Sequence, residues 1–163
     1  MTGTAAQIIR WLTEQKPETI WEIKKRRKKR SLDANGYYWK LVSEMADALR
    51  ISKAEVHNIL LRRYGQPEGI DGRLVEVLIP DTEKAAKKAL MAEEYHLRPT
   101  SFVQAGSKGQ NFRAYILLRG SRTYNTEEMS ILIDGAIREA EQLGIQTLTP
   151  SELERYGQHH KDK

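Results

Sequence analysis

The sequence contains no cysteine, so disulfide bonds, iron–sulfur clusters and thiolate zinc sites are excluded. Long apolar runs are missing as well, and the N-terminus has no basic segment followed by an apolar core. We therefore expect neither a membrane-spanning helix nor a secretory signal, which fits a cytoplasmic protein. With 163 residues, the chain is long enough for one ordinary domain and too short for two large ones.

A pattern typical of a catalytic or metal site is also lacking. The His159-His160 pair lies in a polar tail that offers no rigid frame for a metal ion, and His57 lies on a predicted helix, where a surface or packed histidine is expected. The carboxylates that could serve a two-metal nuclease show no recognisable spacing: Asp33, Asp47, Asp71 and Asp134. We therefore expect no catalytic residues, no metal and no cofactor.

Basic residues, in contrast, are abundant and unevenly placed. Lysine and arginine number 27 against 22 for aspartate and glutamate, which gives a net charge of +5. Residues 1–65 have a net charge of +7, because 14 of the cations and 7 of the anions lie there, and the rest has a net charge of −2. Seven consecutive cations occupy positions 24–30, and three adjacent aromatic residues follow at 37–39. Cations for phosphates and flat rings for bases together indicate nucleic-acid binding, although such a run can also be a solvated strand end.

Apolar periodicity and capping signals predict an α+β fold, with a small mixed or antiparallel sheet packed with several helices in a single domain. The N-terminal helix, at about 4–15, is expected to lie against the sheet. Helices are predicted at 4–15, 33–50, from Ser52 to Gly65, 80–94, from Asn125 or Thr126 to Gly144, and briefly after Thr149. Strands are predicted at 19–26, 74–79, 100–105 and 111–119.

Two of these elements carry candidate binding residues. In the strand 111–119, alternation puts Arg113, Tyr115 and Arg119 on one face and the apolar residues on the other, so one face is expected to be cationic with an aromatic ring. In the helix 33–50, Trp39 lies at the border of the apolar stripe, where it either stacks on a base or caps the core. The loop 106–110 lacks a phosphate-binding GxxxxGK[ST] frame and reads as a hairpin turn, in which Lys108 can reach a phosphate.

The segment from Arg30 to Asn35 (Arg-Ser-Leu-Asp-Ala-Asn), with Trp39 four residues later, resembles the Arg-Ser-Leu-Asp/Asn-x-Asn…Trp segment of the NinB family. Ser121-Arg122, ahead of a predicted long helix, gives a second and weaker likeness to the same family. The two likenesses together cover roughly residues 18–150. This resemblance implies a phage-encoded recombination mediator in a bacterial host cell. Such a protein binds single-stranded DNA as a homodimer and helps to load a host or phage recombinase onto strands coated by single-strand-binding protein, with no catalytic centre and no cofactor.

The basic and aromatic residues and the NinB resemblance together predict a recombination accessory protein that binds single-stranded DNA. We expect that it is not an enzyme and does not bind membranes. Its domains are an N-terminal helical extension (1–17), the α+β domain (18–156) and a disordered tail (157–163). The expected DNA-binding residues are Lys28, Lys29, Arg30, Asn35, Tyr37, Trp39, Lys40, Lys108, Arg113, Tyr115, Arg119 and Arg122. Two alternatives remain: a metal-dependent endonuclease acting on branched or phage DNA, and a non-enzymatic module that binds the acidic tail of a single-strand-binding protein.

Overall fold

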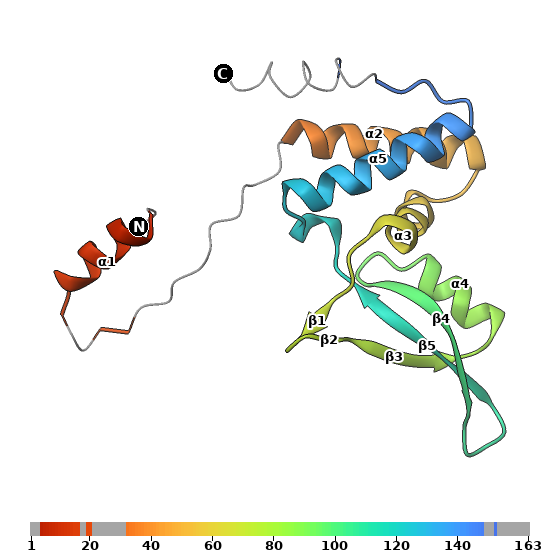
Figure 1. The fold of residues 1–163 in the computed structure, drawn as a ribbon. Coiled ribbons are helices and arrows are strands. Elements are labelled where there is room, and N and C mark those ends of the chain that lie inside the picture. Colours follow the sequence, from red (N-terminus) through yellow and green to blue (C-terminus); the bar gives the residue numbers. More distant parts are fainter. Residues whose placement is uncertain (1–3, 17–18, 21–31, 149–151, 153–163) are drawn as a thin grey trace.

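The computed structural model describes residues 4–16, 19–20, 32–148 and 152 (Figure 1). The described residues form helices and two small antiparallel sheets, which confirms the predicted α+β fold. The elements are α1 (Ala5–Thr13), α2 (Leu32–Leu49), α3 (Lys53–Tyr64), β1 (Gly69–Ile70), β2 (Arg73–Leu74), β3 (Glu76–Pro80), α4 (Glu83–Leu90), β4 (His96–Ala105), β5 (Asn111–Leu118), the 3-10 turn η1 (Ser121–Thr123) and α5 (Thr126–Gln142). None of the described helices is long and apolar enough to cross a membrane.

Two of the three long helices, α3 and α5, begin where local capping signals place them. α3 begins after Ser52, whose side chain accepts a hydrogen bond from the Glu55 amide while Glu55 bonds back to the Ser52 amide. α5 begins after Asn125 with the same reciprocal arrangement to Glu128. Each of these reciprocal arrangements, called a capping box, gives partners to backbone N–H groups that the start of a helix leaves unbonded. The helices predicted at 33–50, 52–65 and 126–144 are confirmed.

α2, α3 and α5 pack on one another and form the larger core. Its most completely buried side chains include Tyr38 and Leu41 of α2, Leu61 of α3 and Leu132 of α5. Each fully buried leucine contributes about 1.5–3 kcal/mol to folding. α2 and α5 lie side by side above the sheet in Figure 1, and α3 leads from this pair down to the strands.

The main sheet has the strand order β3-β5-β4, and both pairings are antiparallel. β4 and β5 form a hairpin around the turn at 106–110, as predicted, and the register of β4 shifts between Pro99 and Val103. β1 and β2 form a separate hairpin whose two turn residues, Asp71 and Gly72, have φ angles of 50° and 76°. Positive φ at both positions is typical of the tight turn that suits the twist of a hairpin.

β5 is buried on both faces, which corrects the expectation of a cationic face. Ala114 and Leu118 are buried on one side, and Tyr115 packs with Ala89 of α4 and Leu97 of β4 in a second, smaller core on the other. α4 therefore covers the face that was expected to meet nucleic acid.

The expectation that the N-terminal helix lies against the sheet is wrong. α1 forms as predicted, with Thr4 and Gln7 in a capping box, but none of its residues is buried. Figure 1 shows it away from the rest of the fold. The basic run 24–30, most of the predicted strand 19–26, nearly all of the final predicted helix and the tail 157–163 lie outside the described residues.

Candidate functional site

Of the three rings predicted to stack on bases, one is accessible. Trp39 is 37% exposed, whereas Tyr37 is 2% and Tyr115 3% exposed. The hydroxyl of Tyr37 accepts a hydrogen bond from the Leu148 amide at 2.9 Å, and its ring belongs to the larger core. Base stacking in this conformation is therefore open to Trp39 and closed to Tyr37 and Tyr115.

Two of the predicted phosphate-binding arginines are held by carboxylates. The guanidinium of Arg113 makes a bidentate pair with Asp81, with distances of 2.8 Å from Nε to Oδ1 and 3.2 Å from Nη2 to Oδ2. Arg119 Nη2 lies 2.6 Å from Glu128 Oε1, and the guanidinium also lies over the Tyr124 ring. Pairing with carboxylates offsets the charge that both arginines would present to a phosphate.

Lys40, Lys108 and Arg122 are exposed, and Lys40 makes a long ion pair of 3.8 Å with Glu44. Asn35 is half-buried, with its Oδ1 enclosed by protein. Lys28, Lys29 and Arg30 lie outside the described residues. Lys108 lies in the turn beyond the far end of β4, whose ten residues span about 30 Å at about 3.3 Å per residue, so Lys108 is remote from the Trp39 pocket at the His96 end.

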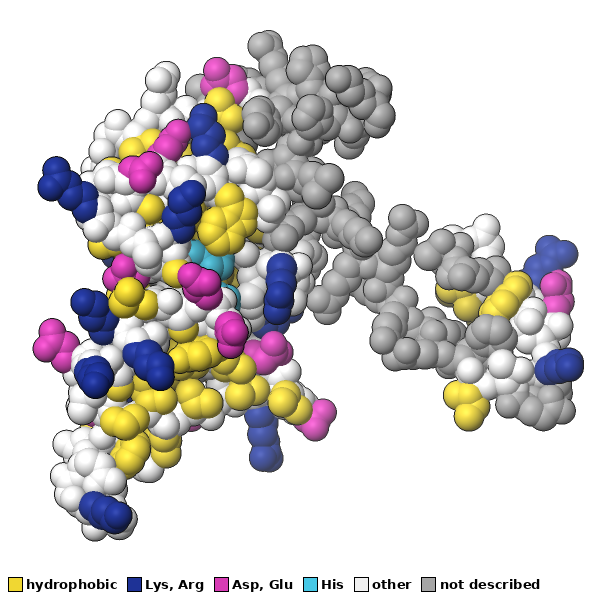
Figure 2. Space-filling view, turned by 180° about the vertical axis from the view of Figure 1, so that it is seen from behind, with side chains coloured by type: hydrophobic (Ala, Val, Ile, Leu, Met, Phe, Trp, Pro, Cys, Tyr) yellow, Lys and Arg dark blue, Asp and Glu magenta, His cyan; other side chains and the backbone are white. Residues whose placement is uncertain are grey.

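A pocket of about 270 Å³ lies beside Trp39. It is lined by Trp39 of α2, Lys53 and His57 of α3, Glu93, His96 of β4 and two alanines. Figure 2 shows histidine side chains in a hollow of this face, next to hydrophobic side chains and with side chains of both charges around it. The pocket therefore combines an aromatic ring, polar rings and charged groups contributed by three different elements.

The pocket floor is a buried polar cluster. The Tyr38 hydroxyl lies 2.7 Å from His57 Nδ1, and the rings of His57 and His96 meet edge to face with centroids 5.1 Å apart. The Trp39 ring packs on His57 at 4.8 Å, and His96 Nδ1 lies 2.7 Å from Asn58 Oδ1. These contacts hold Trp39 against the polar rings rather than free in solvent.

The Asn58 amide defines which nitrogen of His96 carries a proton. Its Nδ2 donates to the carbonyls of Leu90 at 2.8 Å and Ala92 at 2.7 Å, which fixes Oδ1 toward His96. Because Oδ1 can only accept, Nδ1 of His96 is the donor, and in the neutral ring Nε2 is unprotonated. Nε2 lies beside Gly120, where an added Cβ would be 3.5 Å away.

Burial keeps both histidines neutral at pH 7. Burial, reinforced by the charge of His96, lowers the pKa of His57 to about 4. Burial and then the charge of Arg122 lower the pKa of His96. Arg122 is close by, since an added Cβ at Gly120 would lie 3.5 Å from His96 Nε2 and 4.0 Å from Arg122 Cγ.

Sequence reasoning missed this cluster. Tyr38, His57, Asn58 and His96 lie up to 58 positions apart and follow no fixed spacing. The one available signal was local: His57 and Asn58 are polar residues within the apolar stretch of α3, and a buried polar residue needs a hydrogen-bond partner. Which partner each finds depends on how the helices and β4 pack.

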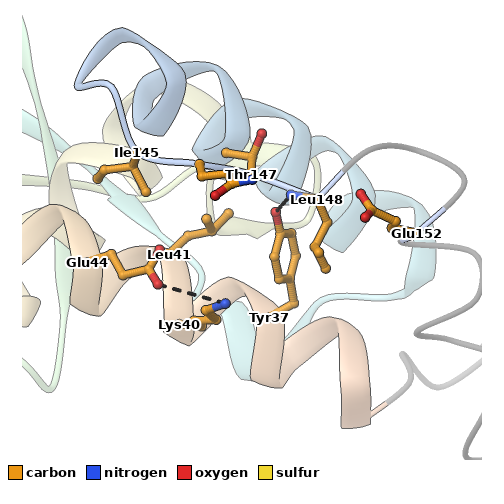
Figure 3. Close-up of a pocket in the computed structure, with 9 residues that line it drawn as sticks. Tyr37, Lys40, Leu41, Glu44, Ile145, Thr147, Leu148 and Glu152 are labelled. Atoms are coloured by element: carbon orange, nitrogen blue, oxygen red, sulfur yellow. Dashed lines mark hydrogen bonds and ion pairs between the residues drawn. The ribbon is translucent and has the colours of Figure 1, made fainter.

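A larger pocket of about 390 Å³ lies between α2 and the segment 145–148 (Figure 3). The Tyr37 ring points toward Leu148, and Lys40 faces Glu44 along α2. Carboxylates of Glu44 and Glu152 line it. They disfavour a phosphate there, so the Trp39 pocket is the better candidate site.

Metal ligands do not gather in the part of the chain that the structure describes. No three histidine, aspartate or glutamate side chains lie close enough there to hold an ion. His159 and His160 lie outside the described residues.

Comparison with known proteins finds no matching family model and no matching solved structure. A protein of Caenorhabditis elegans named "Putative hydroxypyruvate isomerase" is 37% identical to this chain over 86 residues. The match covers 52% of this chain and 31% of the worm protein, so this chain spans about a third of that relative's length. The relative is named as an isomerase and not as a NinB protein. The expectation that the chain belongs to the NinB family is therefore wrong.

Proposed function

We propose that the protein binds single-stranded DNA at the Trp39 pocket. The observation that carries the proposal is the exposed ring of Trp39 at a pocket lined by Lys53 and two neutral histidines, with Arg122 beside it. An aromatic face can stack on any base, and stacking contributes about 1–3 kcal/mol per base. A pocket of about 270 Å³ suits one unpaired base better than a duplex, whose bases are already stacked on one another.

Lys53 and Arg122 are the cations beside the Trp39 pocket that support this proposal among the described residues. If each neutralises one phosphate, the logarithm of the affinity falls with the logarithm of salt concentration at a slope of about −1.4, from about 0.7 per contact on single strands. The basic run 24–30 would steepen the slope. Recombinase loading, by contrast, was implied by the NinB resemblance alone and is not proposed.

Fluorescence polarisation of a labelled mixed-sequence 12-mer, as a single strand and as a duplex, tests the proposal at low and high salt. Trp39→Leu keeps apolar volume against His57 but removes the ring, so the affinity for the single strand should fall at least about fivefold. Phe102→Leu is the matched control, because Phe102 is 56% exposed on β4 and does not line the pocket. Absent or salt-insensitive binding, or equal losses in both variants, would contradict the proposal.

A second candidate function follows from the worm relative and from one feature of the pocket. The unprotonated Nε2 of His96 can accept a proton, as a general base in an isomerase does. Incubating the protein with hydroxypyruvate and following its loss tests this candidate, with His96→Gln as the control variant. Turnover that His96→Gln abolishes would favour the isomerase over DNA binding.

A further inference from the structure

The outer side of α4 is cationic. Lys84, Lys87 and Lys88 are exposed and lie three and four positions apart, so they share one side of the helix. The other side carries Ala89, which is 2% exposed and packs in the smaller core. Glu83 is the one acidic residue of α4. We call the side with the three lysines the α4 lysine face.

These lysines are not paired with carboxylates, unlike the arginines considered above. Arg113 and Arg119 each pair with a carboxylate, whereas none of the three lysine side chains makes an ion pair with a residue that the structure describes. The helix dipole favours cations in the last turn, but it does not favour Lys84, which lies in the first turn. An unpaired lysine is free to neutralise a phosphate and release the counterion condensed on it.

The C-terminal end of α4 adjoins the Trp39 pocket. Ala92 and Glu93, which follow the helix and its cap, line the pocket. The Asn58 side chain donates to the carbonyls of Leu90 and Ala92, which ties this end of α4 to the pocket floor. The helix has eight residues and is about 12 Å long at about 1.5 Å per residue. Figure 2 shows Lys and Arg side chains over α4 on the face that also carries the hollow with the histidines.

We propose that a single strand bound at Trp39 continues along the α4 lysine face, where Lys84, Lys87 and Lys88 neutralise its phosphates. This inference rests on the proposed single-strand binding and gives that binding a path. About four nucleotides cover 12 Å at about 3.4 Å each, so the lysines are within reach of the backbone next to the base in the pocket. Three phosphate contacts of about 0.7 each make the salt slope steeper by about 2.

The first test removes the charges of the α4 lysine face. A triple variant with Lys84→Gln, Lys87→Gln and Lys88→Gln keeps α4, because glutamine is a good helix former. Polarisation titrations of the single-stranded mixed-sequence 12-mer at several salt concentrations should give a slope about 2 less steep than that of the wild type. Each single substitution should remove about 0.7 from the slope, so the result does not depend on the triple variant alone.

A charge-matched triple variant is the control. Arg10→Gln, Arg73→Gln and Lys108→Gln remove three positive charges from exposed residues of α1, β2 and the hairpin turn, none of which lines the pocket. The slope of this variant should equal that of the wild type.

The outcomes separate the path from the binding itself. An unchanged slope in the lysine variant, or equal changes in both triple variants, would overturn the path along α4 while single-strand binding stands. Failure of the wild type to bind the single strand would overturn both proposals. A slope that becomes less steep in the lysine variant and not in the control would support the path.

Discussion

Lowering the pH should destabilise the protein through His57. The pKa of His57 is about 4 in the folded state because its ring is buried, whereas in the unfolded chain the ring titrates near about 6.5. Between these values the unfolded state binds more protons, so each step toward lower pH favours unfolding. The stabilisation is complete above about pH 6.5 and is lost as the pH falls toward 4. His96, whose pKa is also lowered, acts in the same direction.

The size of the effect follows from the two pKa values. One pKa unit corresponds to about 1.4 kcal/mol, so the full window is worth about 3 kcal/mol and the step from pH 7 to pH 5 about 2 kcal/mol. This loss is a sizeable part of the total free energy of unfolding of a small domain, which is roughly 5–15 kcal/mol. The hydroxyl of Tyr38, which contacts His57, has its pKa raised by burial and stays protonated throughout.

Urea unfolding at pH 7.0 and pH 5.0 measures this contribution when wild type and His57→Gln are compared. Glutamine can still hydrogen-bond the Tyr38 hydroxyl but does not titrate, and carboxylates elsewhere contribute equally to both proteins. The wild type should lose about 2 kcal/mol more free energy of unfolding than the variant over this interval. Equal losses in the two proteins would refute the reasoning that His57 is buried and neutral.

Three further predictions concern packing, capping and the basic surface. Gly135→Ala should lower the free energy of unfolding by about 1–3 kcal/mol, because its Cβ would collide with the Tyr64 ring, and an unchanged melting temperature would argue against this helix contact. Asn125→Ala should cost about 1 kcal/mol in urea unfolding by removing the cap of α5, and a neutral effect would place the helix start elsewhere. Arg113→Ala should change single-strand affinity less than about twofold in polarisation titrations, since Asp81 already pairs with its guanidinium; a large loss would show that the pair opens on DNA.

Helix boundaries could be predicted from sequence because their causes are local. Ser52 and Glu55 lie three residues apart, as do Asn125 and Glu128, and each pair acts within a single turn. The β1–β2 hairpin also had a local signal, the Asp71-Gly72 pair, but the predicted elements included no hairpin there.

The accessibility of the aromatic rings could not be predicted in this way. Tyr37 is bonded to the Leu148 amide, 111 positions away, and Tyr115 is covered by α4, whose packing the alternation of β5 does not reveal. The alternation of side chains along a strand shows which residues share a face, but it does not show which face another element covers. The site likewise depends on long-range packing, since Asn58 bonds His96 across 38 positions.

The most direct test of single-strand binding at the Trp39 pocket is the fluorescence of Trp39 itself. A variant with Trp11→Phe and Trp21→Phe leaves Trp39 as the one tryptophan of the chain. Titration with the single-stranded mixed-sequence 12-mer at low salt should quench its emission as a base stacks on the indole, and added salt should restore it. Emission that stays constant while polarisation reports bound DNA would contradict the account, because the strand would then bind away from Trp39.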